Sequence, residues 1–312
     1  MKSFLFRSQL VFIIVIVFAS LASADLCQMT FSPFDKSLTH RIIDQCFTEN
    51  CWLATEIGAI ESAAKSDGMP VTISFEVQFL RSLYWLMKSQ ILNEDFTQLE
   101  PSYPFEQVAP ILESIGLYPE SESIVDLNKE SVDSYYETAN FFIQNNSAPS
   151  WADFLERVAQ KNNVNIQSAF PYVSSSIEFM DPLDLYFTHP SIRANSGQLQ
   201  FNPMAMKYRD RSKFERLIRR SLYKYKRPIK FAMNLDHSQI VGPLIKSPKH
   251  PEATEQHSML IVDIVKNKYK RVIGFVVQNS WGSKSGVNGY FFIDKKTFYS
   301  SSYLAIIPSW TN

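Results

Sequence analysis

Cys51 is the first residue of this chain whose type and setting suit covalent chemistry. It stands between Glu49-Asn50 and Trp52, at the first turn of a predicted helix whose apolar residues recur three or four positions apart. Unpaired N–H groups and the positive end of the helix dipole favour a thiolate there, which is the nucleophilic form of cysteine. Position alone leaves a second interpretation open, in which Cys51 packs in the core as a small apolar residue.

A thiol nucleophile needs a base, and His257 is the one of five histidines whose setting suits that role. It begins a predicted strand, and a residue at a strand entrance can face a cleft while the strand itself stays in the core. The others precede the predicted helix or lie in irregular and polar segments: His40, His189, His237 and His250. For any single histidine, a structural role is the alternative interpretation.

Asn279 lies 22 residues after His257, at the end of one predicted strand, and Gly289 begins the next. Its side-chain amide can accept an imidazole N–H and so fix the tautomer that leaves the other ring nitrogen facing sulfur. Trp281 can cover this hydrogen bond and exclude water, which strengthens it. These residues predict a Cys–His–Asn arrangement for acyl transfer.

In this order and spacing, the motifs resemble those of the papain-like cysteine peptidases: Gln45 six residues before Cys51-Trp52, His257 before an apolar strand, then Asn279-Ser280-Trp281-Gly282 with Gly289-Tyr290. The resemblance implies that the Gln45 side chain and the backbone N–H of Cys51 form an oxyanion hole. It also implies that Trp52 and Trp281 line the cleft and shield the triad. It covers Gln45–Gln90 and Ile229–Ile307, and two further stretches resemble the bleomycin-hydrolase branch and its bacterial relatives: Ile115–Pro119 and Arg227–Ile229.

Three departures from the family pattern concern the substrate side of the site. Glu49 stands two residues before the nucleophile, where the family usually has glycine, and its carboxylate would disfavour the thiolate. No Gly-Gly pair is present to bind an extended substrate, so the segment between Met87 and Ser114 that lines this subsite is not identified. Cys51 and His257 lie 206 residues apart, which implies an inserted helical region within about 100–225.

The elements expected around these residues change character along the chain. Helices are predicted at Cys51–Lys65, from Ser74 onward, and at Phe105–Ile115, Ser131–Ile143, Ser150–Lys161 and Lys207–Tyr225. Short strands are predicted at Ile229–Leu235, Ser258–Val265, Val272–Gln278 and Gly289–Ile293. We therefore expect a two-lobe α+β fold, in which a helical lobe (about 51–227) packs on an antiparallel sheet or barrel lobe (about 228–312, with the N-terminal segment), and the active site lies in the cleft between them.

The N-terminus, Met1–Ala24, has the basic, apolar and small segments of a secretory signal peptide. Its removal leaves one domain, Asp25–Asn312, which we expect to be secreted or periplasmic and active without a long inhibitory propeptide. Three cysteines then remain. Their odd number suggests a Cys27–Cys46 disulfide with Cys51 free, and the alternative is that all three are reduced.

The composition of the chain limits the classes of molecule that it is expected to bind. The 31 basic and 31 acidic residues give no support for nucleic acid or a membrane surface, and no cluster has the spacing of a metal or cofactor site. The leading hypothesis is a cysteine-type peptidase with peptide or protein substrates and no cofactor. Two alternatives keep the same fold, namely a catalytically retired binding protein and an acyl transferase that uses the same triad. The oligomeric state is left open.

Overall fold

The structure, a computed structural model, describes residues 39, 41–68, 70–99, 112, 127–163 and 198–308. The chain divides into two compact units, Met1–Lys36 and Ser37–Asn312, and all described residues belong to the second. The predicted signal peptide, Cys27 and the predicted helix Phe105–Ile115 lie outside the described residues, apart from Leu112 within that helix. Among the described residues, no helix is long and apolar enough to cross a membrane.

Four helices form the first part of the described chain. They are α2 (Cys51–Ser66), α3 (Phe75–Leu92), α5 (Lys129–Gln144) and α6 (Trp151–Lys161). The polar residues before α3 and α6 cap them, because Ser74 Oγ accepts from Val77 N and Ser150 forms a capping box with Asp153. The helices predicted from Cys51, Ser74, Ser131 and Ser150 are therefore confirmed. Their starts lie within two residues of those expected, and so do the ends of the three helices for which an end was predicted.

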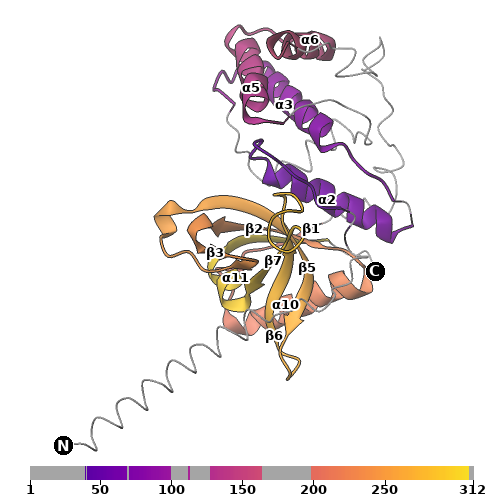
Figure 1. Ribbon diagram of the computed structural model, residues 1–312, viewed down its shortest axis with the longest axis vertical. Helices are drawn as coiled ribbons and strands as arrows, with labels where there is room; N and C mark the ends of the chain where they lie inside the picture. Colours follow the sequence, from indigo (N-terminus) through magenta and orange to yellow (C-terminus); the bar gives the residue numbers. More distant parts are fainter. Residues whose placement is uncertain are drawn as a thin grey trace, which may run out of the picture. The chain divides into compact units, whose positions relative to one another are not determined.

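A mixed eight-stranded sheet forms the second part (Figure 1). Its order is β1-β8-β2-β5-β6-β7-β4-β3, and every pair is antiparallel except β4 with β7. The order begins and ends on different strands, so the sheet is open and the barrel alternative is wrong. The strands are β1 (Gln198–Phe201), β2 (Ile229–Leu235), β3 (Ile240–Val241), β4 (Leu244–Ile245), β5 (Glu255–Lys266), β6 (Val272–Gln278), β7 (Tyr290–Asp294) and β8 (Ser302–Pro308).

The structure corrects several predicted boundaries. β2 and β6 have the predicted bounds, whereas β5 begins three residues early, at Glu255, because its first residues pair with the end of β2. The predicted helix Lys207–Tyr225 is α10 (Tyr208–Arg219), which continues as a π-helical turn, Arg220–Lys224. Strands β1, β3, β4 and β8 and the helix α11 (Lys295–Ser301) were not predicted.

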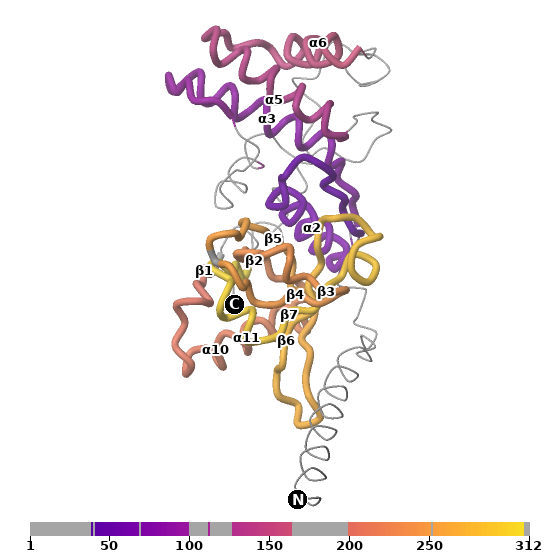
Figure 2. The backbone as a smooth tube through the Cα atoms, turned by 60° about the vertical axis from the view of Figure 1, so that its left-hand side comes forward, coloured from indigo at the N-terminus to yellow at the C-terminus, as the bar shows by residue number. Residues whose placement is uncertain are grey.

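Two apolar cores lie on the two faces of the sheet. The alternation of side chains along β2 shows this, because Phe231 and Met233 join the core that includes Phe214 of α10 and Phe298 of α11, whereas Ala232 joins the core of α2, α3, α5 and α6. Figure 1 shows α2 beside the sheet, and Figure 2 shows α3, α5 and α6 stacked one on another beyond it. The helix that begins with Cys51 is thus the element that joins the helical part to the sheet.

Buried ion pairs fix α2 on the sheet. Lys230 Nζ of β2 lies 2.6 Å from Glu56 Oε2, with both side chains nearly excluded from solvent. Two residues before β2 begins, Arg227 bonds to Asp67 at 2.5 Å and to the carbonyl of Ala63 at 3.1 Å. These contacts hold the middle and the end of α2, so the position of its first turn against β5 is determined.

Candidate active site

The thiol of Cys51 lies at the start of α2, against the beginning of β5. Cys51 is the first helical residue, and Asn50 before it is the N-cap residue. The backbone N–H of Ser258, the residue after His257, donates to Cys51 Sγ over 3.4 Å. The thiol is free and only 7% exposed. This hydrogen bond therefore holds the backbone next to His257, the candidate base, against the sulfur of Cys51, the candidate nucleophile.

His257 and Asn279 form the hydrogen bond expected between a base and its orienting residue. His257 Nε2 lies 2.7 Å from Asn279 Oδ1, and the backbone N–H of Ser280 donates to the same oxygen over 2.7 Å. Because Ser280 N can only donate, the atom that it meets must be the amide oxygen, so His257 contributes a proton from Nε2. This tautomer leaves Nδ1 of a neutral His257 unprotonated and able to accept a proton.

Backbone pairing holds the Asn279 side chain in place. Asn279 follows the last residue of β6, and its backbone N–H donates to the carbonyl of Gly289 over 3.0 Å. Gly289 has φ +84°, and a Cβ on it would lie 2.5 Å from Ile42 Cγ2, so both its backbone conformation and its surroundings require glycine. Asn279 Nδ2 is buried without a partner among the described residues. This donor is thus available to a group that enters the site.

Gln45 is joined to the same loop by its backbone and its side chain. Its N–H donates to the carbonyl of Ser280 over 2.8 Å, and Asp44 beside it forms an isolated bridge with Trp281. The Ser280 hydroxyl donates to Gln45 Oε1, which turns the amide oxygen toward Ser280 and leaves the NH₂ group as the outward donor. Ser280 thereby links Gln45 to Asn279. Sequence reasoning gave Ser280 no role, although its place in the Asn279–Gly282 run was the signal.

Trp281 packs on the imidazole of His257, with ring centroids 4.8 Å apart. Its other neighbours are His237, at 5.2 Å, and Phe291, which meets it edge-on at 5.8 Å. The structure thus places Trp281 where it can shield the hydrogen bond between His257 and Asn279. His237 was not selected from the sequence, because only the fold brings this distant turn beside Trp281.

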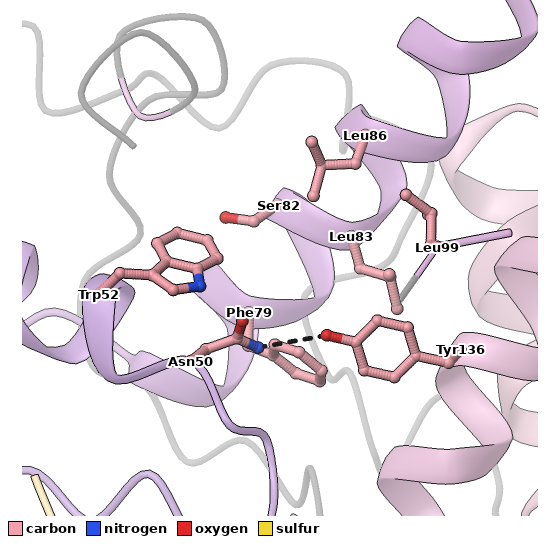
Figure 3. A pocket seen from close by; sticks show the side chains of 8 residues that line it. All are labelled: Asn50, Trp52, Phe79, Ser82, Leu83, Leu86, Leu99 and Tyr136. Carbon is pink, nitrogen blue, oxygen red and sulfur yellow. Dashed lines mark hydrogen bonds between the residues drawn. The ribbon is translucent and has the colours of Figure 1, made fainter. Parts of the chain in front are cut away.

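Trp52 lies in a different environment, within the helical core. With Asn50 it forms one side of a small pocket that is completed by α3, Leu99 and Tyr136 (Figure 3). Ser82 Oγ is buried there and has no hydrogen-bond partner among the described residues. The structure brings together Cys51, His257, Asn279, Gln45 and Trp281, whereas the indole of Trp52 packs among helices.

Burial governs the charge states of the two reacting groups. It raises the pKa of the Cys51 thiol, and the hydrogen bonds from Ser258 lower it by less. Burial also lowers the pKa of His257 to about 4, against smaller opposing effects of the hydrogen bond to Asn279 and the charge of Glu255. The backbone N–H groups of Cys51 and Trp52 at the helix start also lower the pKa of the Cys51 thiol, as expected, but burial outweighs them in the unliganded site. Thiol and imidazole are both neutral there.

Glu49 adopts a left-handed backbone conformation, with φ +54°, and its side chain is exposed. A glycine takes this conformation at little cost, which gives a physical reason for glycine at this position in the family pattern. Its charge acts on the helical side of the site, at Tyr136. Burial raises the pKa of Tyr136 to about 12, a hydrogen bond from Asn50 opposes this rise, and the charge of Glu49 adds a smaller increase. That bond joins Asn50 Nδ2 to the Tyr136 hydroxyl over 3.5 Å (Figure 3).

The predicted Cys27–Cys46 disulfide is not tested, since Cys27 lies outside the described residues. Cys46 is exposed and has φ +49°. The pair therefore stays a prediction. Among the described residues, no group of three or more His, Cys, Asp and Glu side chains could hold a metal ion.

Comparison with known proteins relates one part of the chain to a protein family and the fold to solved structures. Residues 220–309 match the model of the Peptidase C1-like family, and no curated protein matches the chain. The chain is similar to the solved structure of PepW from Lactobacillus rhamnosis HN001 at 15% identity, with a TM-score of 0.54, over 90% of this chain and 82% of PepW. It is also similar to digestive procathepsin L2 from the Tenebrio molitor larval midgut, at 17% identity and a TM-score of 0.45, over 88% of this chain and 66% of that chain. A further similar structure is bromelain from Ananas comosus, at 11% identity and a TM-score of 0.43, over 89% and 96% of the two chains.

The likeness to PepW shows that the two chains share a fold of helices and a sheet. The family match covers the part of this chain that carries β2, β5, β6 and β7, and with them His257 and Asn279. The family match thus relates residues 220–309 to Peptidase C1-like sequences, and the likeness to PepW adds the fold alone.

Proposed function

We propose that this protein is a secreted cysteine peptidase that hydrolyses peptide bonds with Cys51 as nucleophile, His257 as base, Asn279 as orienting residue and Gln45 in the oxyanion hole. The observation that carries the proposal is the 2.7 Å hydrogen bond between His257 Nε2 and Asn279 Oδ1. It leaves His257 Nδ1 as the acceptor of a proton, while Ser258 holds the thiol at the same end of β5.

In the first half of the reaction, the Cys51 thiol attacks the carbonyl carbon of the scissile bond and its proton passes to His257 Nδ1. Because thiol and imidazole are both neutral at rest, the proton moves as the sulfur attacks, so His257 acts as a general base. The oxyanion that forms can accept hydrogen bonds from the Gln45 NH₂ group and the backbone N–H of Cys51. His257 then gives the proton to the leaving amine, and the C–N bond breaks to leave a thioester on Cys51.

In the second half, water attacks the thioester carbonyl and gives a proton to His257. The C–S bond breaks, the proton returns to the sulfur, and the carboxylic acid product leaves. Asn279 holds the imidazole in one orientation through both halves, because Ser280 and Gly289 fix the Asn279 backbone and side chain. Trp281 covers the imidazole and limits the access of water to this hydrogen bond.

The first test is cleavage of a generic internally quenched peptide by the wild type and by Cys51→Ala. We expect activity to fall to background in the variant, because no other group in the site can form the thioester. His257→Ala should lose activity by about four orders of magnitude or more. His250→Ala is the matched control, since it removes an exposed histidine that pairs with Glu252 at 3.1 Å. Cleavage that survives Cys51→Ala would contradict the proposal.

A second function, peptide binding without cleavage, is favoured by one observation. Burial favours the neutral forms of both Cys51 and His257. A protein that only binds peptides does not need either residue to become charged. An electrophilic peptide that targets active-site thiols separates the two functions at mildly acidic pH. A peptidase should be labelled at Cys51 in a one-to-one ratio, with loss of labelling in His257→Ala, whereas a retired protein should stay unlabelled while still binding the parent peptide.

Export belongs to the same proposal. Removal of Met1–Ala24 would release a chain that begins at Asp25 into a secreted or periplasmic compartment, as one papain-like domain with helical and sheet lobes. N-terminal sequencing of the active species tests this directly. A start well after Asp25, or a cut within about 100–225, would show that a maturation step is needed.

A further inference from the structure

Glu255 and His237 form an exposed pair at the edge of the candidate site. His237 Nε2 lies 3.2 Å from Glu255 Oε2, with the two side chains 53% and 77% exposed. The His237 ring stacks on one side of Trp281 at 5.2 Å, and the His257 ring packs against the same indole at 4.8 Å. Trp281 therefore connects this surface pair to the imidazole that would move the proton.

The register of β5 puts Glu255 on the same side of the strand as His257. Successive side chains of a strand alternate between its faces, so residues two apart point the same way and lie roughly 7 Å apart. Gln256 between them turns away and bonds to the Tyr303 hydroxyl over 3.2 Å. The charge of Glu255 also reaches the site, because it raises the pKa of His257, against the larger lowering by burial.

The chemistry of acyl transfer determines which part of a substrate lies near His237 and Glu255. The acyl part stays bonded to Cys51, whereas the leaving amine takes its proton from His257. The residues after the scissile bond therefore lie on the side of His257 and Trp281. An extended chain advances about 3.3–3.6 Å per residue, so Glu255 comes within reach of the first or second residue of the leaving group.

We propose that Glu255, held by His237 beside Trp281, selects substrates with a lysine or arginine side chain one or two residues after the scissile bond. When His237 is neutral, the pair carries the single negative charge of the Glu255 carboxylate. A basic side chain that reaches it gains an ion pair, while an acidic side chain at the same place is repelled. This inference rests on the proposed peptidase function, and it names the substrate class.

A peptide series with one fixed acyl part and Lys, Ala or Glu after the scissile bond tests the selection. For the wild type at neutral pH, we expect kcat/KM to be about fivefold higher for Lys than for Ala, the upper range for a solvent-exposed ion pair, and lower again for Glu. Glu255→Gln should abolish the advantage of Lys, measured as the ratio of kcat/KM for the Lys and Ala peptides within the same variant. Glu255→Lys should reverse the order of the Lys and Glu peptides.

The chain offers a matched control in Glu252, which pairs with His250 Nδ1 at 3.1 Å and is 74% exposed. Glu252→Gln removes the same charge from a similar pair and should keep the wild-type preference. A preference for Lys that persists in Glu255→Gln, or that disappears equally in Glu252→Gln, would overturn the proposal. His237→Asn should weaken the preference, because Glu255 then loses the partner that positions it.

Binding to the Cys51→Ala protein separates this inference from the peptidase proposal. Calorimetry with uncleaved Lys and Ala peptides should show about fivefold tighter binding of the Lys peptide, lost in Cys51→Ala/Glu255→Gln. Selective binding without cleavage by the wild type overturns the peptidase proposal alone. Cleavage with no dependence on charge overturns the selection alone. The absence of both cleavage and selective binding overturns both.

Discussion

The sheet and the helical part of this protein contribute to the candidate site by different physical means. On the sheet side, His257, Asn279 and Gln45 are placed by strand register and by short hydrogen bonds through Ser280. On the helical side, Cys51 depends on the position of one helix, and the helices beyond α2 pack through apolar side chains. The family match covers residues 220–309, the sheet side alone.

The difference shows where sequence change is tolerated. Moving a strand by one residue would turn His257 to the opposite face, so the sheet side cannot vary without losing the arrangement. A helix presents its first residue in the same way whatever packs against its far side. The region of α5 and α6, where the sequence predicts an insertion, can therefore differ from relatives as long as α2 stays in place.

The largest effect on stability should come from breaking the ion pair that joins the two parts. Lys230→Ala leaves the buried carboxylate of Glu56 without its partner, and we expect the free energy of unfolding to fall by about 3–5 kcal/mol. Lys161→Ala is the control, because Lys161 and Glu137 pair on the surface of the helical part and should contribute at most about 1 kcal/mol. Urea unfolding measures both. Equal losses would mean that α2 is held mainly by apolar packing.

The next prediction compares the loss of activity on removing Gln45, the proposed oxyanion donor, with the loss on removing Ser280, which orients it. Gln45→Ala should lower kcat by about 100- to 1000-fold with little change in KM, because the proposed oxyanion contact forms only in the transition state. Ser280→Ala keeps the amide but releases its oxygen, so we expect a smaller loss, about tenfold. Steady-state kinetics on one peptide compares them. A loss in Ser280→Ala that equals or exceeds the loss in Gln45→Ala would assign the main role to Ser280.

Much of this fold could be predicted from the chain itself. The apolar spacing after Cys51 and the capping residues Ser74 and Ser150 determine three helices locally. The β-branched and aromatic residues of Ile229–Leu235 and Val272–Gln278, bounded by turn residues, indicate two strands. Strands of two residues, such as β3 and β4, carry no periodic signal. The edge strand β1 and strand β8 also went unpredicted, and their pairing with each other is visible only in the folded chain.

The candidate site was predictable to the same extent and for similar reasons. Cys51, His257 and Asn279 could be selected because each begins or ends an element, and Gln45 because of its spacing from Cys51. The charge state of Cys51 could not, because burial depends on how α2 docks on the sheet and here it outweighs the start of the helix. The contact of His237 with Trp281 likewise depends on tertiary structure.

Acid should destabilise the protein through the sheet side. The pKa of His257 falls from 6.5 in an unfolded chain to about 4 in the folded one, so the unfolded state binds the extra proton first as the pH drops. The free energy of unfolding should therefore decrease between about pH 6.5 and pH 4, by about 3 kcal/mol from this group. His257→Gln should flatten this part of the profile, whereas His250→Gln should not. A profile that is the same in the wild type and His257→Gln would contradict the burial of a neutral imidazole.

The smallest effect concerns Glu49, which lies two residues before Cys51. Glu49→Gly relieves a left-handed conformation that costs a non-glycine residue about 1–2 kcal/mol, but the glycine loses more freedom on folding. We expect a net gain in the free energy of unfolding of at most about 1 kcal/mol. Glu49→Ala keeps the backbone strain and removes only the carboxylate, so it should show no such gain. Both variants should lower the pKa of Tyr136 slightly, because burial is the main cause of its rise and the Glu49 charge a smaller one, and ultraviolet titration of the tyrosines can follow this change. A gain that appears equally in both variants would assign the cost of Glu49 to its charge rather than to its backbone.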